Sequence, residues 1–360
     1  MSERRASTDR VDVETLAEYP DRIDVRSPAE FALDHLPGAI NLPVLDDAER
    51  ARVGTLYVTS PFAARKLGAA IVARNIAEML ESAVFNQPRE WQPVIYCWRG
   101  GQRSRALAHV LNEIGWRAAQ LDGGYRSYRR HVVAQLEVSP ARFHFVVVCG
   151  LTGAGKSRFL AALRGAGAQT LDLEGLACHR GSLLGMLPGG TQPSQKGFET
   201  RLLAALEQLD PARVVFVESE SKRIGRLQLP PRLLEHMRDG VSLALATPRS
   251  TRVALLKEEY GHFLRDSALL AERLQPLAPL IGKSKLADWG AMADAGDWDK
   301  LIAELLEMHY DPLYERSLKT NFGGSETRTL DVRDATPAGF AELARETLSD
   351  FEQAHTATAV

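Results

Sequence analysis

An apolar run leads into a glycine-rich turn in the segment Val94-Ile-Tyr-Cys-Trp-Arg-Gly-Gly-Gln-Arg-Ser104. Its apolar start predicts a buried strand, and the pattern from Arg105 to Ile114 predicts the helix that follows. The glycine-rich turn between them carries Cys97, Arg99 and Arg103. Backbone N–H groups in such a turn, together with the positive end of a helix, bind anions and stabilise a thiolate. The stretch therefore predicts a reactive cysteine in an anion-binding loop, although a free cysteine is often only a packed apolar residue.

The composition is that of an ordinary globular protein. The chain has 360 residues, enough for two or three domains, with 45% hydrophobic and 25% charged residues. The net charge of -2 means that any contact with nucleic acid must come from local basic patches. Cys97, Cys149 and Cys178 form no CxxC pair, which favours a reducing compartment and argues against a structural zinc site.

The chain contains no sign of a membrane segment. Met1 to Arg10 is polar, and no later stretch approaches the ~18 apolar residues of a membrane span. We therefore expect a cytoplasmic enzyme that does not contact a membrane.

The segments around the Cys97 loop alternate between strand and helix patterns, as in a parallel α/β domain. Residues 22–131 resemble a rhodanese domain, because Asp24-Val-Arg-Ser-Pro-Ala-Glu-Phe31, His35-Leu-Pro-Gly-Ala-Ile-Asn-Leu-Pro43 and Leu121-Asp-Gly-Gly-Tyr125 occur in that family's order. We expect this domain to span residues 1–139, with a helix from Phe62 to Phe85 that covers the sheet.

The rhodanese resemblance also implies roles for the loop residues. Cys97 would be the catalytic residue, and the residues matching Asp24 and Arg26 are more often scaffold. The spacing of six from Cys97 to Arg103, one wider than usual in that family, favours a donor as bulky as a substituted phosphate. The residues expected to bind this anion are Arg99, Gly100, Gly101, Arg103 and Ser104.

A second motif lies in the segment that we assign to a P-loop domain, residues 140–260. The strand-like Phe143-His-Phe-Val-Val-Val-Cys149 leads into Gly150-Leu-Thr-Gly-Ala-Gly-Lys-Ser157 and a helix from Arg158 to Leu163. This matches the phosphate-binding pattern G-x-x-x-x-G-K-[ST] between a strand and a helix. The residues expected to bind a diphosphate are Gly150, Thr152, Gly153, Gly155, Lys156 and Ser157.

Polar clusters follow the next strands of this domain. Acids at the carboxyl ends of parallel strands face the ligand crevice, so Glu218 and Ser157 would hold a Mg²⁺ ion there. A turn is predicted for 192–199 and a helix from Thr200 to Leu209. The remaining crevice candidates are Asp172, Glu174, His179, Arg180, Glu220, Lys222 and Arg223.

The rest of the chain is mostly helical in pattern. A strand is predicted for Val241 to Ala246, within the P-loop domain. Residues 261–360 are expected to form a mainly helical C-terminal extension. The predicted fold class is therefore α/β, with a rhodanese-like domain, a P-loop NTPase-like parallel-sheet domain and this extension.

Taken together, five segments resemble the tRNA 2-selenouridine synthase family: 97–104, 150–157, 172–182, 192–199 and 218–225. That resemblance implies an enzyme that replaces sulfur by selenium in 2-thiouridine at the tRNA wobble position. The implied substrates are selenophosphate and geranyl diphosphate, with S-geranyl-2-thiouridine as intermediate, no tightly bound cofactor and a Mg²⁺ ion at the P-loop. A protein that supplies selenophosphate would be a further partner.

Two other functions are compatible with the motifs. One is an ATP-dependent kinase or sulfurtransferase whose rhodanese domain carries a persulfide, and the other is a non-catalytic binding module. The sequence does not determine the isoprenoid length, the oligomeric state, nucleotide use or the path of the tRNA. Basic residues that are candidates for tRNA contacts are Arg126, Arg129, Arg130 and Arg226, with Lys222 and Arg223.

Overall fold

The computed structural model describes residues 10–322 and 326–358, so most of the polar N-terminal stretch lies outside the described part. The chain divides into two compact units. The first extends to Gln135 and also takes in Pro193–Ala204, and the second comprises Leu136–Gln192 and Ala205 onward. The predicted first domain ends close to this boundary, at residue 139. The short segment that returns to the first unit was assigned by sequence to the P-loop domain.

The first unit is built on a parallel sheet of short strands. Within the described residues the strand order is β1-β5-β4-β2-β3, and every pairing is parallel. The strands are β1 (Arg10–Val11), β2 (Arg22–Asp24), β3 (Ala39–Asn41), β4 (Val94–Tyr96) and β5 (Ala119–Leu121). Strand β4 is buried along its whole length, as its run of apolar residues predicts.

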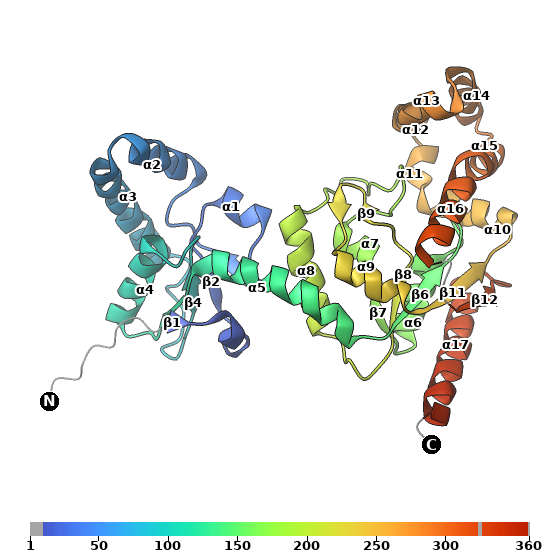
Figure 1. Cartoon of the computed structure of the whole chain (residues 1–360). Coiled ribbons are helices and arrows are strands. Elements are labelled where there is room, and N and C mark those ends of the chain that lie inside the picture. The colour runs from blue at the N-terminus through green and yellow to red at the C-terminus, as the bar shows by residue number, and fades with distance from the viewer. Residues whose placement is uncertain (1–9, 323–325, 359–360) are drawn as a thin grey trace. The chain divides into compact units, whose positions relative to one another are not determined.

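Helices cover both faces of this sheet (Figure 1). Helix α4 buries Leu107, Ala108 and Leu111, and the three- and four-residue spacing of these side chains faces them toward β2 and β4. The predicted helices at 105–114 and 62–85 are confirmed as α4 and α3. The helical segments of the unit are η1 (Val13–Glu18), α1 (Pro28–Leu33), α2 (Asp47–Thr59), α3 (Pro61–Glu81), α4 (Gln102–Ile114) and α5 (Gly124–Val138).

The second unit contains the P-loop sheet. Its described strands lie in the order β12-β11-β6-β8-β7, again all parallel. The strands are β6 (Phe145–Cys149), β7 (Gln169–Leu171), β8 (Val215–Glu218), β11 (Val241–Ala246) and β12 (Thr327–Asp331), and β9 (Arg223–Ile224) pairs with β10 (Leu227–Gln228) as a separate ribbon. Strand β6 is central, and α6 (Lys156–Gly165) begins directly after the P-loop.

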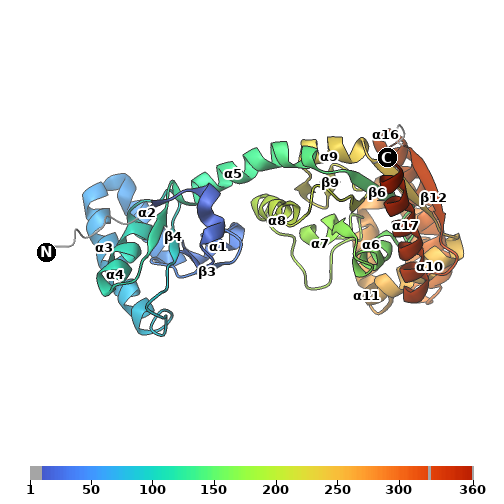
Figure 2. The ribbon, with the colours of Figure 1, turned by 90° about the horizontal axis from the view of Figure 1, so that it is seen from below.

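Strand β12 lies within the segment that we predicted as a mainly helical extension. It adds an edge strand to the P-loop sheet, and α17 (Pro337–Thr358) then packs against α6 (Figure 2). Phe340 and Ala344 of α17 join the same core as Phe159 and Leu163 of α6. The C-terminal region is therefore part of the P-loop unit, and the α/β fold class with its helical C-terminal segment is confirmed.

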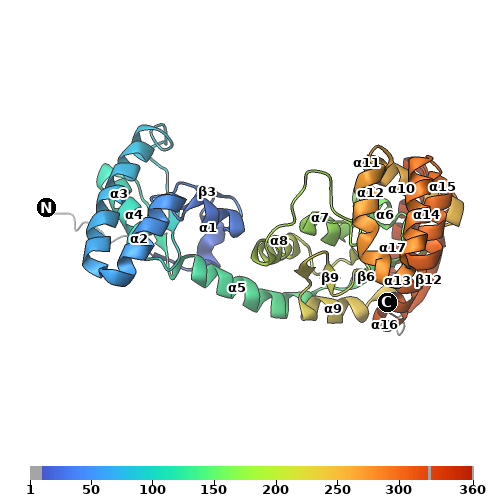
Figure 3. The ribbon, with the colours of Figure 1, turned by 90° about the horizontal axis from the view of Figure 1, so that it is seen from above.

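The helical segments between β11 and β12 form a cluster beside the P-loop sheet (Figure 3). Trp289 is fully buried at its centre, with Leu301, Leu274 and Phe263 around it. Apart from α6, α8 (Gln195–Glu207) and α17, the helical segments of the second unit are η2 (Ser139–Arg142), α7 (Leu173–Ala177), α9 (Pro231–Arg238), α10 (Arg249–Glu259), α11 (Gly261–Leu264), α12 (Ser267–Leu274), η3 (Gln275–Leu277), α13 (Ala278–Ile281), α14 (Lys283–Asp294), α15 (Trp298–Leu305), η4 (Leu306–Tyr310) and α16 (Asp311–Phe322).

One boundary was predicted wrongly. The helix expected from Thr200 to Leu209 is α8 (Gln195–Glu207), which begins within the segment that we predicted as a turn. Pro193 and Ser194 mark the true start, because Ser194 Oγ accepts a hydrogen bond from Gly197 N at 3.0 Å. Among the described residues, no helix is long and apolar enough to cross a membrane.

Candidate functional site

Cys97 lies between the end of β4 and the start of α4. Its sulfur accepts hydrogen bonds from Gly101 N and from Ser104 Oγ, each at 3.3 Å. The side chain is only 3% exposed and is also part of the hydrophobic core of the first unit. The cysteine is thus both packed and supplied with donors, which suits a sulfur atom that carries negative charge.

The buried amide of Gln120 holds this loop in place, a role that the sequence did not suggest. Its Nε2 atom lies 2.7 Å from Gly100 O, 3.0 Å from Gly101 O and 2.6 Å from Ser104 Oγ. Gln120 is on β5, the strand beside β4, so sheet pairing brings it to the loop. These contacts fix the carbonyl groups of Gly100 and Gly101, while Gly101 N donates to the Cys97 sulfur.

The glycine pair that ends the rhodanese-like pattern allows the loop to pass close to α5. Gly124 has φ +59°, and a Cβ there would lie 2.3 Å from both Cys97 O and Gly100 N. Any side chain at this position would therefore displace the cysteine loop. This close approach explains the Gly-Gly that the sequence showed before Tyr125.

The two loop arginines have different surroundings. Arg103 Nη1 donates to Glu30 Oε2 at 2.9 Å, whereas Arg99 is exposed. Burial would raise the pKa of Glu30, but the hydrogen bond and charge of Arg103 lower it below its usual value. Arg103 is thus held beside the loop by Glu30, and Arg99 is the more accessible positive charge.

Asp24 and Arg26 form a scaffold beneath this loop, as the resemblance implied. Both side chains are almost completely buried, with Arg26 Nη2 2.6 Å from Asp24 Oδ2 and 2.7 Å from Asp34 O. The guanidinium also lies 4.0 Å from the centre of the Tyr125 ring. A guanidinium this buried, with Nε and Nη2 bonded to Asp24 and Asp34, supports the structure around the loop rather than contacting a substrate.

The segment Pro193–Ala204 packs on the same side of the first unit. Asp34 Oδ2 accepts hydrogen bonds from Thr200 Oγ1 at 3.1 Å and from Tyr125 Oη at 2.7 Å. Lys196 Nζ lies 5.8 Å from the ring centre of Trp98, the residue after Cys97. The ammonium group of Lys196 on α8 therefore lies next to the cysteine loop. Local sequence patterns could not predict this contact.

The P-loop of the second unit has the geometry that its motif predicts. Gly150, Gly153 and Gly155 all have positive φ, and Gly155 precedes the first turn of α6. Lys156 Nζ donates to Gly150 O at 3.0 Å and lies 4.6 Å from the centre of the Tyr314 ring. The loop is a preformed cradle for a phosphate group at a helix N-terminus.

Carboxylates surround this lysine. Ser157 Oγ donates to Glu174 Oε2 at 3.0 Å, and Glu218 Oε2 accepts from Leu173 N at 3.2 Å. Burial, followed by the charge of Glu174, raises the pKa of Glu220 to about 8. Burial also raises the pKa of Glu174 and of Glu218, with neighbouring acids adding to the shift of Glu218. These groups share protons with one another unless a cation neutralises them.

The predicted Mg²⁺ ligands fit a cation only together with a phosphate. Among the described residues, no three acidic, histidine or cysteine side chains are grouped closely enough to hold a metal. Ser157 is hydrogen-bonded to Glu174 rather than to the predicted partner Glu218. Mg²⁺ usually takes one or two protein oxygens and completes its shell with phosphate and water, so Ser157 with Glu174 would suffice.

Only some of the predicted crevice residues line the open crevice beside the P-loop. Glu174, Arg180 and Glu220 line it, together with Tyr260, Tyr310 and Tyr314 from the helical segment. Arg180 is fixed by Glu259 O at 2.6 Å. The predicted residues that are not among its lining are Asp172, which caps α7, the buried His179 and Glu218, and the exposed Lys222 and Arg223.

The basic candidates for RNA contact differ in their availability. Arg129 is ion-paired with Glu199, and Arg226 Nη2 donates to Gln192 O at 2.6 Å. Arg126 and Arg130 on α5 are exposed. The exposed pairs are therefore Arg126 with Arg130 in the first unit, and Lys222 with Arg223 in the second.

Comparison with known proteins gives consistent matches to both units. Residues 12–131 match the rhodanese-like domain family, and residues 143–275 match the family described as the tRNA 2-selenouridine synthase AAA domain. A protein named tRNA 2-selenouridine synthase from Aeromonas salmonicida (strain A449) is 36% identical over 322 residues, which cover 81% of this chain and 85% of that protein. A protein of the same name from Sulfurovum sp. (strain NBC37-1) is 38% identical over 83% of this chain and 89% of its own length.

Among solved structures, the N-terminal domain of a putative ATP/GTP binding protein from Clostridium difficile 630 is 31% identical to this chain. It covers 35% of this chain and 99% of its own, with a TM-score of 0.32.

Proposed function

The chain belongs to the tRNA 2-selenouridine synthase family, and from this premise we propose that it exchanges sulfur for selenium in 2-thiouridine at the tRNA wobble position. The observation that carries the proposal is that one chain holds both a cysteine in a loop of hydrogen-bond donors and a complete P-loop. Exchange at a thiocarbonyl needs two different operations, because sulfur must first become a leaving group and selenium must then be delivered. Two separate anion-binding centres suit these operations.

The first operation that we assign to the P-loop is transfer of a geranyl group. The thiocarbonyl sulfur attacks C1 of geranyl diphosphate, a C–S bond forms, and the C–O bond breaks with the electron pair leaving on diphosphate. The base loses its N3 proton to water in the same step. Negative charge grows on that leaving group, so Lys156 and the N–H groups of the P-loop stabilise the transition state. A Mg²⁺ ion, when bound, supplies further charge neutralisation, and Ser157 and Glu174 are the residues that would hold it.

The second operation that we assign to the Cys97 loop is delivery of selenium. Selenium from selenophosphate attacks C2 of the S-geranylated base, and geranylthiolate leaves and takes up a proton. Water then cleaves the Se–P bond and releases phosphate. In this proposal Cys97 would hold the selenium donor, and Arg99 would supply positive charge for its phosphate group together with Arg103, which Glu30 holds beside the loop.

The function can be tested with purified protein and tRNA that carries 2-thiouridine. Geranyl diphosphate and selenophosphate are supplied separately and together, and the modified nucleoside is weighed by mass spectrometry. We expect an S-geranyl nucleoside with geranyl diphosphate alone and a selenium nucleoside with both. Phosphate transfer or nucleotide hydrolysis without tRNA, and no change in nucleoside mass, would support instead the ATP-dependent kinase or sulfurtransferase alternative.

A further inference from the structure

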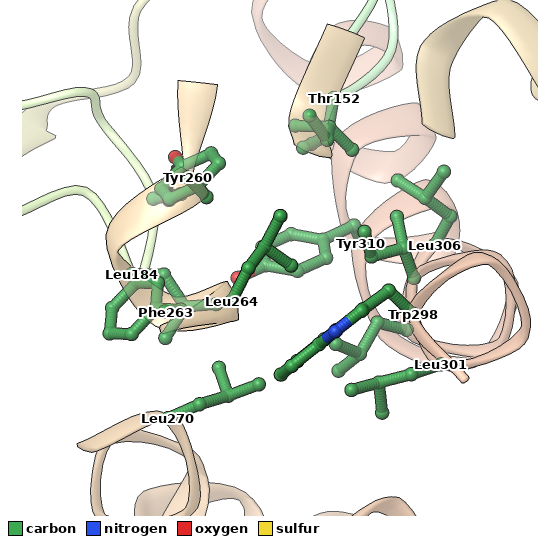
Figure 4. Close-up of a pocket in the computed structure, with 14 residues that line it drawn as sticks. Thr152, Leu184, Tyr260, Phe263, Leu264, Leu270, Trp298, Leu301, Leu306 and Tyr310 are labelled. Atoms are coloured by element: carbon green, nitrogen blue, oxygen red, sulfur yellow. Dashed lines mark hydrogen bonds between the residues drawn. The ribbon is translucent and has the colours of Figure 1, made fainter. Parts of the chain in front are cut away.

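A second cavity lies beside the P-loop, enclosed by the helical cluster of the second unit (Figure 4). About 540 Å³ of empty space lies between its lining side chains, a figure that includes the open mouth and solvent outside it. Thr152 of the P-loop lies at one end, and Leu270 and Trp298 lie at the other (Figure 4). The cavity is narrow and leads from the phosphate-binding loop into the helices.

The lining of this cavity is almost entirely carbon. Leucine, isoleucine, phenylalanine and tryptophan side chains from α10, α11, α12, α15 and η4 form the walls. The hydroxyl groups of its two tyrosines already have partners: Tyr260 Oη lies 3.2 Å from Ser182 Oγ, and Tyr310 is hydrogen-bonded to Ser182 and to the backbone of Leu184. The walls therefore offer a ligand dispersion contacts and few free hydrogen bonds.

This cavity adjoins the crevice that holds the phosphate cradle. Five residues line both spaces: Thr152, Ser182, Leu256, Tyr260 and Tyr310. The crevice also contains Lys156 and Ser157. A single ligand can thus place a charged end on Lys156 and an apolar end among the helices.

The chemistry of the walls restricts what that apolar end can be. A nucleotide base carries several donors and acceptors, and burying them without partners is unfavourable. A hydrocarbon chain has no such groups, and each methylene that it buries strengthens binding by roughly fourfold. Branched, flexible chains also suit a narrow cavity lined by leucines.

We infer that this cavity binds the isoprenoid chain of an allylic diphosphate, and that Leu270 and Trp298 at its far end limit the chain length. The inference rests on the proposed function and extends it, because it assigns ligand selection to the helical cluster rather than to the P-loop. The P-loop holds the diphosphate of any such ester, and the cavity distinguishes a chain from a nucleoside and a short chain from a long one.

Binding measurements without tRNA test this assignment. The affinities of the full-length protein for inorganic pyrophosphate, dimethylallyl diphosphate, geranyl diphosphate, farnesyl diphosphate and ATP are measured by calorimetry with Mg²⁺ present. We expect geranyl diphosphate to bind at least tenfold more tightly than pyrophosphate. Equal affinities for these two ligands would overturn the inference.

A cavity-filling variant and a cavity-enlarging variant locate the chain. Leu264 is a half-buried wall residue, and Leu264→Trp should weaken geranyl diphosphate binding about tenfold without changing pyrophosphate binding. Leu280→Trp is the matched control, because Leu280 is 66% exposed on α13 and does not line the cavity. Trp298→Ala should raise the affinity for farnesyl diphosphate relative to that for geranyl diphosphate about tenfold.

The outcomes separate this inference from the proposed function. Chain-dependent binding that Leu264→Trp abolishes, in a protein that does not modify tRNA, would support the cavity and refute the function. Normal geranylation and an unchanged KM for geranyl diphosphate in Leu264→Trp would refute the cavity while the function stands. A loss of ATP binding in Leu264→Trp equal to the loss for geranyl diphosphate would also refute it, because a nucleoside would then occupy the same space.

Discussion

At the scale of single residues, Cys97 and Lys156 are the two groups to which the proposed steps assign different chemistry. Cys97→Ala removes the sulfur that accepts from Gly101 and Ser104, so we expect selenation to be lost while geranylation continues. Lys156→Ala removes the charge at the P-loop and should slow geranylation about 100-fold or more. Mass spectrometry of the nucleoside reads both products.

Cys178→Ala is the matched control for the cysteine, since Cys178 lies in the second unit and lines neither the crevice nor the apolar cavity. Normal selenouridine formation by Cys97→Ala would contradict the role assigned to this cysteine.

Gln120 gives a prediction that separates positioning of the loop from its chemistry. Gln120→Ala removes an amide NH2 whose two hydrogens are shared among three acceptors of the loop, and one such hydrogen bond is worth about 1 kcal/mol. We expect selenation to slow by roughly tenfold or more, mainly through kcat, with geranylation unchanged. Kinetics with pre-geranylated tRNA would check this, and an equal loss in both steps would instead indicate general unfolding.

Glu220 links the crevice to pH. The folded protein keeps this proton up to about pH 8, whereas the unfolded chain loses it near pH 4.3. The folded state therefore binds more protons in this window, and its stability falls as pH rises from about 4.3 to about 8. Glu220→Gln removes that fall, so its Tm should match wild type at pH 4 and exceed it by several degrees at pH 8.5.

Thermal melts across this pH range provide the measurement. Glu342→Gln is the matched control, because Glu342 is exposed on α17 and does not line the P-loop crevice. If the Tm difference between Glu220→Gln and wild type were the same at every pH, the Glu220 proton would not govern stability.

At the scale of elements, helix α8 belongs largely to the first unit although it follows the P-loop strands in sequence. Asp34 is buried and accepts from both Thr200 and Tyr125. Asp34→Ala leaves two buried hydroxyl groups without this partner, which should cost about 2–4 kcal/mol and loosen α8. Hydrogen exchange of the α8 amides should rise in this variant.

Thr200→Val tests the same contact from the other side. It keeps the volume of the side chain and removes one hydrogen bond, so a smaller rise in exchange, corresponding to about 1 kcal/mol, is expected. Unchanged protection of α8 in both variants would show that Asp34 does not hold the helix.

The elements also show where sequence reasoning succeeds and where it stops. The Cys97 loop and the P-loop are each a strand, a glycine turn and a helix, so all their signals lie within about twenty consecutive residues and were found. Gln120 and β12 act through pairing with strands distant in sequence, and no local pattern reports such pairing. The sequence did not predict the apolar cavity for the same reason. Each helix in its walls has an ordinary amphipathic pattern, and the cavity forms only where several of these helices pack together.

At the scale of the whole molecule, a net charge of -2 must coexist with binding of a polyanion. The exposed basic pairs, Arg126 with Arg130 and Lys222 with Arg223, are the groups available for this role. Replacing either pair by glutamine should weaken tRNA binding and reduce the slope of log affinity against log salt by about 1–2. Binding measured between 50 and 200 mM salt checks the slope.

Arg345→Gln serves as the control for this experiment, since Arg345 is exposed on α17 and outside both basic pairs. An affinity that does not vary with salt in the wild-type protein would show that these clusters are only solvated surface.

Lys156 has a partner before any substrate arrives. Its ammonium group donates a hydrogen bond to Gly150 O. Burial lowers the pKa of Lys156, but the neighbouring Tyr314 and Glu174 raise it above the usual value. An incoming diphosphate must displace these internal partners of Lys156. Its binding free energy therefore includes only the difference between the lysine–diphosphate contact and the contacts that the lysine gives up. The same competition returns the lysine to the protein when diphosphate departs. For the diphosphate chemistry that we propose, this competition would favour rapid product release over tight retention of inorganic pyrophosphate.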